Sequence, residues 1–187
     1  MINTASKNHK AVVTWLECTE LPRQLPALPV NLHASLIRVE NIPLHFYRYL
    51  QWRTGRRWHW VHRLRMKDEE LAHLVHDPKT EIRILNIDGA PAGFFELRRE
   101  DATTTNLVYF GLIDNAIGRG VGKWLLGQAQ LAAWNQPISR LTVSTNSLDH
   151  PAALPLYQKM GFRPTSQSEA VVRPLTDDEL LALMKAE

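Results

Sequence analysis

Short runs of apolar, β-branched and alternating residues recur along the chain, and such runs predict β-strands. Two of them, 80–87 and 90–97, flank Asp88-Gly89, which is a strong signal for a two-residue turn. These two runs are therefore expected to form an antiparallel hairpin. Further strands are expected at 32–39, 106–112, 140–145 and 169–173. Strand 106–112 is expected to return antiparallel to the hairpin, and strand 140–145 to lie parallel beside 106–112.

A period of three to four residues marks the helices. From Val121 onward, the apolar positions 121, 125, 129 and 132 share one helical face, and Pro137 ends this segment. Helices are also expected at 41–50 and 68–76. Together with the strands, they predict a mixed α+β sheet rather than a doubly wound parallel one.

The C-terminal third carries two further helix signals. Thr176 and Glu179 have the spacing of a capping box, which begins a short helix that reaches about residue 185. Pro155 lies inside an otherwise helical pattern, so that helix is expected to start late or to bend.

The first thirty residues differ from the rest. Residues 11–17 are rich in β-branched and aromatic side chains and predict an added edge strand. Pro22, Pro26 and Pro29 then interrupt regular structure. We therefore expect an N-terminal extension, 1–30, followed by a single domain at 31–187.

Composition narrows the class of protein. A chain of 187 residues with 44% hydrophobic and 22% charged residues is ordinary for one globular domain. The formal net charge of +3 is too small to argue for nucleic acid binding by itself. The single cysteine, Cys18, excludes an internal disulfide, and no apolar run is long enough to span a bilayer. A cytoplasmic protein without membrane contact is expected.

A glycine-rich turn after the 106–112 strand carries most of the functional signal. Gly118, Gly120 and Gly122 allow positive φ and close approach of a ligand to the backbone. The helix that follows directs its free N–H groups toward the same space, and Arg119 and Lys123 add positive charge. An anion, most simply a pyrophosphate, is the expected ligand. The spacing fits neither a Walker loop nor a dinucleotide fingerprint.

The residues from about Leu32 to Phe162 resemble the GNAT superfamily of N-acetyltransferases, most strongly from Tyr109 onward. The segment 117–122, Ile-Gly-Arg-Gly-Val-Gly, is similar to the family signature Gln/Arg-x-x-Gly-x-Gly/Ala, with Ile117 at the first place. The segment 150–162 is similar to the later motif Asn-x-x-Ala-x-x-Leu-Tyr-x-x-x-Gly-Phe, with His150 in place of Asn. The resemblance implies a GNAT fold, in which helices cover both faces of a mostly antiparallel sheet and a splayed strand pair holds the cofactor.

The resemblance also implies an activity, which is transfer of an acetyl group from acetyl-CoA to a primary amine of a small-molecule or peptide-like acceptor. No metal is implied. Cofactor contacts are expected from Leu112, Ile113, Gly118, Arg119, Gly120, Val121, Gly122, Lys123 and His150. Tyr157 matches the family tyrosine that protonates the CoA thiolate, and its alternative is a core aromatic side chain.

The general base is less clearly marked. Family members often carry Glu where this chain has Asn106 or Thr145, and neither side chain can take a proton. Glu96 on the hairpin is the expected substitute, acting directly or through water, and His150 is a second candidate. The alternative for Glu96 is a solvated strand carboxylate, and solvent alone could also deprotonate the amine.

The acceptor is left open. Aromatic residues and arginines interleave between 46 and 65, among them Trp58, Trp60, Arg56 and Arg57. They predict either a helix–loop–helix cap or a pocket wall for an amine that also carries an acidic group. RNA binding is a third reading. Two histidine pairs, His59/His62 and His73/His76, offer too few ligands for a metal site. A non-catalytic CoA-binding module, an RNA-directed acetyltransferase and a homodimer remain alternatives.

Overall fold

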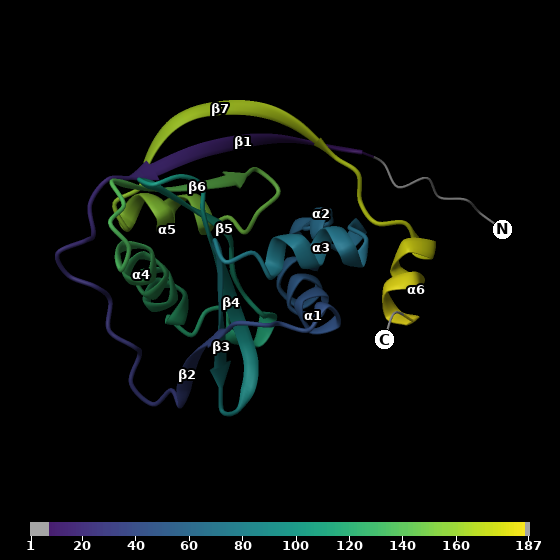
Figure 1. Ribbon diagram of the computed structural model, residues 1–187, viewed down its shortest axis with the longest axis horizontal. Helices are drawn as coiled ribbons and strands as arrows, with labels where there is room; N and C mark the ends of the chain where they lie inside the picture. Colours follow the sequence, from purple (N-terminus) through teal and green to yellow (C-terminus); the bar gives the residue numbers. More distant parts are fainter. Residues whose placement is uncertain (1–7, 186–187) are drawn as a thin grey trace.

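The computed structural model describes residues 8–185 (Figure 1). Seven strands form one sheet with the order β2-β3-β4-β5-β6-β1-β7. In chain order they are β1 (His9–Cys18), β2 (Ala34–Val39), β3 (Thr80–Ile87), β4 (Ala90–Arg99), β5 (Thr104–Leu112), β6 (Arg140–Asn146) and β7 (Arg163–Val172). Only β5 and β6 are paired in parallel within the described residues; the other neighbours are antiparallel.

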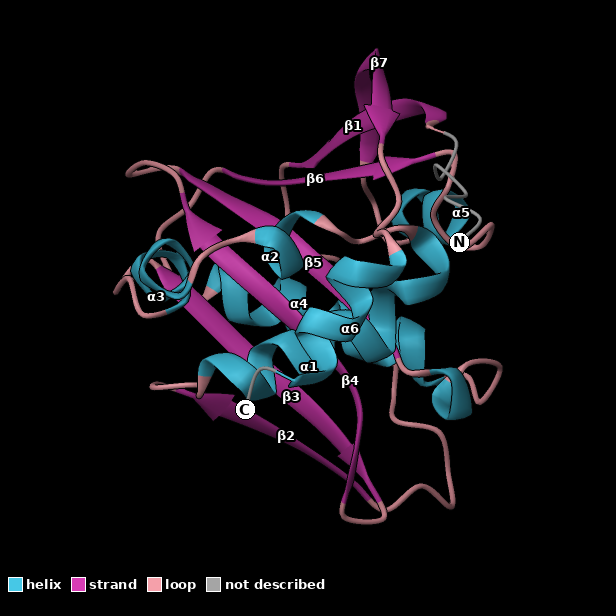
Figure 2. Ribbon diagram, turned by 90° about the vertical axis from the view of Figure 1, so that its right-hand side faces the viewer, coloured by secondary structure: helices cyan, strands magenta, loops and turns pink. Residues whose placement is uncertain are grey.

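Helices cover both faces of the sheet (Figures 1 and 2). One face carries α4 (Val121–Trp134) and α5 (Ala153–Lys159), and the other carries α1 (Leu44–Gly55), α2 (His62–Arg65) and α3 (Asp68–Val75). The 3₁₀ turns η1 (Arg56–Trp58) and η2 (Asp114–Ala116) and the C-terminal α6 (Asp177–Lys185) complete the fold. The predicted mixed, mostly antiparallel α+β architecture is confirmed.

Two apolar cores explain this layering. The larger joins α4 and α5 to the sheet and includes Leu125, Ala129 and Phe162, all fully or almost fully buried. The smaller core lies under α1 and α3 and is centred on Tyr47, Leu71 and Phe94, the last of which is on β4. Strand β4 lies between the two cores, so six consecutive residues of it are buried. The sheet therefore needs a helical layer on each side.

The N-terminal strand lies inside the sheet, so the edge position predicted for it is wrong. Strand β1 pairs with β6 on one side and with β7 on the other. The reason is that β7 begins at Arg163, six residues before the predicted start at 169, and is long enough to pair with β1 from His9 to Glu17. The extension is thus built into the same sheet as the remainder of the chain.

Strands β5 and β6 separate soon after they meet (Figure 2). Their parallel pairing runs only from Thr104↔Arg140 to Leu107↔Val143. On its other side β5 has a bulge, because Glu96 pairs with Tyr109 while the next residue, Leu97, pairs with Leu107. A bulge bends a strand and increases its twist. It lies where β5 leaves β6, and the two strands are splayed beyond it.

Candidate functional site

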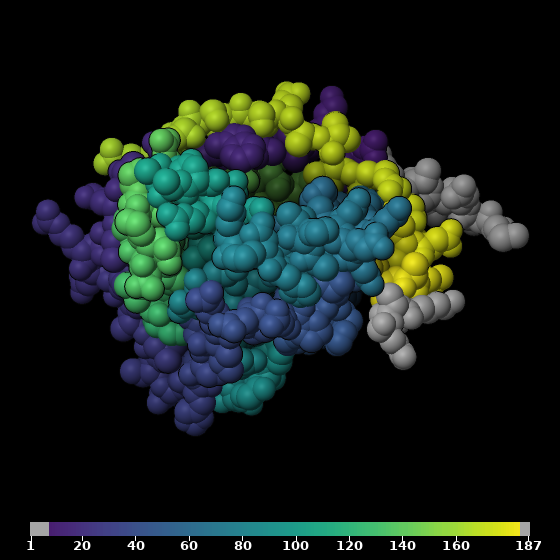
Figure 3. All heavy atoms as spheres, viewed as in Figure 1, coloured from purple at the N-terminus to yellow at the C-terminus, as the bar shows by residue number. Residues whose placement is uncertain are grey.

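A cavity of about 1000 Å³ occupies the gap between the splayed strands. Its floor comes from β5 residues 107–112 and β6 residues 143–146. One end reaches the glycine loop before α4, and the other reaches the η1–α2 segment and the last residues of β7. In Figure 3 the surface is hollowed beneath β1 and β7. The cavity therefore joins the predicted anion site to the aromatic segment.

The glycine loop forms the first end of this cavity. Gly118 and Gly120 have φ of 81° and 77°, in the left-handed region that favours glycine. Gly120 caps the fourteen-residue helix α4, which directs its N-terminal N–H groups toward the loop. Gly122 and Lys123 also line the cavity.

The remaining two residues of the predicted loop are placed differently. The Val121 side chain is fully buried in the larger core, so only its backbone faces the loop. Arg119 is outside the cavity lining and is exposed.

Backbone groups of β5 face the gap at alternate residues. The Ile113 N–H donates to the Ala92 carbonyl oxygen on β4 at 2.8 Å. Hydrogen-bonded pairs alternate in an antiparallel ladder, so the Gly111 backbone also faces β4, and Leu112 and Phe110 face the opposite side. Leu112 lines the cavity and Ile113 does not. Of the two predicted backbone contacts, only Leu112 is directed into the gap.

Two side chains of the later motif line the cavity. Tyr157 is almost fully buried, and burial, followed by the charge of Asp149, raises the pKa of its phenol well above the ordinary value. Its proton is thus retained across the neutral range. His150 accepts a hydrogen bond at Nδ1 from the Ala152 N–H at 3.0 Å, and its ring lies edge-on to Trp58 with centroids 5.0 Å apart. In its neutral form this arrangement leaves the His150 proton on Nε2.

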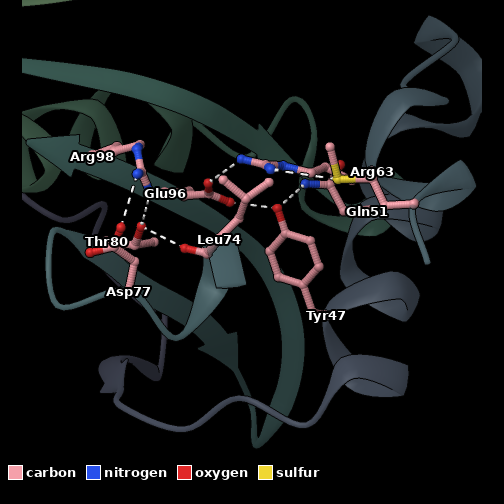
Figure 4. A network of polar contacts seen from close by, with 9 residues as sticks. Tyr47, Gln51, Arg63, Leu74, Asp77, Thr80, Glu96 and Arg98 are labelled. Atoms are coloured by element: carbon pink, nitrogen blue, oxygen red, sulfur yellow. Dashed lines mark hydrogen bonds and ion pairs between the residues drawn. The ribbon is translucent and has the colours of Figure 1, made fainter. Parts of the chain in front are cut away.

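Glu96 lies outside the cavity lining and is completely buried (Figure 4). Its carboxylate accepts hydrogen bonds from Arg63 at 2.9 Å and from the Tyr47 hydroxyl at 2.5 Å. Gln51 donates to the same hydroxyl at 2.8 Å. Burial raises the pKa of Glu96, and Arg63 and Tyr47 oppose that rise. Arg63 remains charged because Glu96, Tyr47 and Tyr109 offset its burial and raise its pKa. The pair therefore ties α2 to β4.

Trp60 forms a wall at the second end of the cavity. A Cβ atom on Gly55 would overlap the Trp60 side chain, and one on Gly111 would lie 3.0 Å from its ring. Both positions thus need glycine for the ring to be seated. The Trp60 ring lies 5.2 Å from that of Tyr109, and burial raises the pKa of the Tyr109 phenol to about 12.

Asp149, in the turn between β6 and α5, also lines the cavity. Its carboxylate accepts hydrogen bonds from the Trp60 indole N–H at 3.1 Å, the Thr145 hydroxyl at 2.8 Å and the Asn146 backbone N–H at 2.8 Å. Asp149 is not among the site residues predicted from the sequence. Its only sequence signal is an acidic residue just before the later motif, and the partner that orients it lies 89 residues away.

Arg56 and Arg57 of the aromatic segment are bound to a carboxylate of the protein. Arg56 and Arg57 both contact Asp114, at 2.9 and 3.4 Å, and neither lines the cavity. They attach the end of α1 and η1 to η2, next to the glycine loop. Hydrogen bonds from Arg56, opposed by slight burial, lower the pKa of Asp114. The pocket-wall role expected for these two arginines does not match their positions.

The arginines that do line the cavity, Arg65 and Arg173, are also engaged. Arg65 binds both Glu179 oxygens, at 2.9 and 3.1 Å, and the backbone oxygens of Arg173 and Pro174, each at 2.8 Å. Arg173 binds Glu179 at 2.7 Å. These contacts attach α6 to α2 and to the residue that follows β7.

Between residues 8 and 185, no group of three or more His, Cys, Asp or Glu side chains could hold a metal ion. His59 and His62 line the cavity but belong to no such group among these residues. Burial, followed by the charge of His9, lowers the pKa of His59. No helix in the same range is long and apolar enough to cross a membrane.

Comparisons with known proteins agree with this arrangement. The profile of the acetyltransferase (GNAT) domain matches residues 59–174. No curated protein sequence matches the chain.

Many solved structures share the fold, among them the following three. A conserved protein of unknown function from Staphylococcus epidermidis has 11% identity and a TM-score of 0.59, over 90% of this chain and 64% of the other. An IAA acetyltransferase from Bacillus cereus has 23% identity and a TM-score of 0.55, over 71% and 79%. A GNAT family acetyltransferase from Elizabethkingia anophelis, with acetyl-CoA bound, has 20% identity and a TM-score of 0.55, over 71% and 78%. The chain thus spans just under two thirds of the first protein.

Proposed function

Because this chain belongs to the GNAT family of acetyltransferases, we propose that it transfers an acetyl group from acetyl-CoA to a primary amine of a small-molecule or peptide-like acceptor by direct attack. One observation carries the proposal. The gap between β5 and β6 forms a single cavity that runs from the glycine loop to the aromatic wall at Trp60. A two-substrate transfer needs such a continuous space, because the cofactor and the acceptor must meet inside it.

The loop and the gap fit the cofactor. Gly118 and Gly120 have positive φ, and a Cβ built at Gly118 meets no atom within 4 Å, so the backbone lies open to a ligand. We assign the pyrophosphate to this loop, the start of α4 and Lys123, because N–H groups and positive charge favour an anion there. The Leu112 backbone would hold the amide arm of the cofactor in the manner of an added strand.

Bound acetyl-CoA would supply an activated thioester and a thiolate leaving group. Tyr157 is assigned as the proton donor to that thiolate. Its raised pKa keeps the phenol protonated, and its side chain lines the cavity on α5. A general acid of this kind contributes about 10²- to 10⁴-fold to a rate.

We do not retain Glu96 as the general base. Its carboxylate is closed off from the cavity, and both oxygens are engaged with Arg63 and Tyr47. His150 uses its Nδ1 lone pair within its own turn. The proposal is that water in the cavity mouth takes the amine proton, and that the side chains of the site orient the acceptor.

The test begins with cofactor binding. At a ligand concentration of 100 Kd, acetyl-CoA should stabilise the protein by about 2.7 kcal/mol, or roughly 5–10 °C in Tm for a domain of this size. Gly120→Asp should abolish this shift, because it places a negative charge at the pyrophosphate site. Gly89→Asp is the matched control, since Gly89 also has positive φ, at 81°, but lies at the tip of the β3–β4 hairpin.

Turnover separates an enzyme from a module that only binds CoA. Release of the CoA thiol should depend on an added amine and should be lost in Gly120→Asp. An equal Tm shift in a folded Gly120→Asp variant would contradict the loop assignment. Binding without release of thiol from any primary amine would favour the non-catalytic module.

A further inference from the structure

The carboxylate of Asp149 has no cationic partner among the described residues. It lies half-buried on the cavity, and no Lys, Arg or His side chain of residues 8–185 comes within ion-pair distance of it. Its three hydrogen bonds come from neutral donors, namely an indole, a hydroxyl and a backbone N–H. An ionised carboxylate has about four lone-pair sites, so one remains for a ligand.

Aromatic rings surround the same part of the cavity. Trp58, Trp60 and Tyr109 line it, together with His150, whose ring contacts Trp58. The Trp60 N–H edge binds Asp149, so the ring and the carboxylate are held in one fixed arrangement. The negative faces of such rings attract cations, and Trp does so most strongly.

The cations near this part of the cavity are already occupied. Arg65 spreads its donors over Glu179 and two backbone oxygens, and Arg173 shares the same carboxylate. Lys123 lies at the opposite end, beside the glycine loop. An acidic group on the acceptor would therefore have to displace the Glu179 carboxylate to bind either arginine. A positive group would meet the Asp149 carboxylate and the rings of Trp58 and Trp60, whereas the Tyr109 ring already lies against the Arg63 guanidinium, 5.6 Å from its centroid.

We propose that Asp149, Trp58 and Trp60 form a subsite for an ammonium group, and that the acceptor is a cationic amine without an acidic group near it. The proposal rests on the proposed function, because it specifies the substrate class of the same cavity. The ammonium group donates one hydrogen bond to Asp149 and rests against the aromatic rings. Selectivity then comes from charge, since a carboxylate on the acceptor would be repelled by Asp149 and would leave its own charge unpaired.

Three probes of similar length test the charge preference. Each probe has a short chain with an amine at one end. The other end is a methyl group in propylamine, a second ammonium group in 1,3-diaminopropane and a carboxylate in β-alanine. Their binding is measured by calorimetry at one ionic strength, with CoA lacking the acetyl group present, so the readout does not depend on turnover. We expect both cationic probes to bind at least tenfold more tightly than β-alanine.

Variants test the residues. Asp149→Asn keeps a similar shape and should weaken binding of propylamine by about ten- to a hundredfold, the range of a hydrogen bond to a charged group. Trp58→Leu leaves the carboxylate intact and should weaken it by about two- to fivefold, as expected for a cation–π contact. Asp88→Asn removes one negative charge at the hairpin tip and should change nothing, which controls for net charge.

Acetyl-CoA binding separates this inference from the function on which it rests. If the acetyl-CoA Tm shift is preserved in Asp149→Asn while amine binding is lost, the subsite is supported. Tightest binding of β-alanine by the wild type would overturn the proposal, as would unchanged propylamine binding in both Asp149→Asn and Trp58→Leu. Failure of acetyl-CoA to bind the wild type would contradict the proposed function alone.

Discussion

Replacing Glu96 with Gln distinguishes a structural carboxylate from a catalytic one. Glu96 is completely buried and holds Arg63, itself only 6% exposed, together with the Tyr47 hydroxyl. A Gln side chain has nearly the same shape but carries only one acceptor oxygen. Its amide NH₂ would then face either the guanidinium or the hydroxyl, and Arg63 would lose its counter-charge.

The structure sets the expected magnitude. Removing one partner of a buried ion pair costs about 3–5 kcal/mol, because the other charge is left uncompensated. For a domain of this size, about 2–4 °C of Tm is lost per kcal/mol, so Glu96→Gln should lower Tm by roughly 6–20 °C. The double replacement Glu96→Leu with Arg63→Met removes both charges and should cost less than the sum of the single changes.

The assay is thermal unfolding combined with steady-state kinetics, both measured well below the variant's Tm. We expect kcat per folded molecule to stay within about tenfold of wild type. Glu81→Gln on β3 serves as the control, because the surface pairs of Glu81 with Arg83 and Arg38 should contribute at most about 1 kcal/mol. A Glu96→Gln variant with unchanged Tm and a hundredfold lower kcat would refute this reasoning and identify Glu96 as the base.

Three further predictions follow from named contacts. Tyr157→Phe should lower kcat by roughly 10- to 1000-fold while leaving the acetyl-CoA Tm shift intact, and kcat within twofold of wild type would make Tyr157 a packing residue. Arg56→Ala with Arg57→Ala frees Asp114, so we expect weaker acetyl-CoA binding and little change in amine KM; the reverse pattern would place the arginines at the acceptor. Arg65 lowers the pKa of Glu179 to about 2, so the ionised Glu179 stabilises α6 fully above about pH 4.5, and this stabilisation is lost as the pH falls toward 2. The circular dichroism signals of wild type and Glu179→Gln, measured between pH 6 and 2, should therefore converge in acid.

Features set by neighbouring residues were accessible from the sequence. The hairpin turn at Asp88-Gly89 needs positive φ, and both residues have it, at 51° and 81°. The helix predicted from Val121 and ended by Pro137 is α4, Val121–Trp134, because its apolar face and the preceding glycine cap are local signals. The Thr176–Glu179 capping box forms both of its expected hydrogen bonds. In each of these cases the structure depends on contacts within a few residues.

Long-range pairing was not accessible in the same way. The residues flanking Trp60 and those flanking Asp149 do not indicate that the two side chains meet, nor that Asp114 binds Arg56 and Arg57. The interior position of β1 depends on β7, which lies more than 140 residues later. The role of Glu96 could not be predicted for the same reason, because a Glu side chain suits a general base, an ion pair or a surface position. Only packing against α1 and α2 decides between these roles.

The width of the cavity depends on a contact between side chains that lie far apart in the sequence. Beyond Leu107 and Val143 no ladder holds β5 and β6 together, and edges left unpaired in this way are normally covered or paired. Trp60 packs against Gly111 of β5 and donates its indole N–H to Asp149, which follows β6. This contact spans the two strands where the backbone does not. Because the same two side chains belong to the proposed ammonium subsite, acceptor binding and the separation of the cofactor strands should be linked through them.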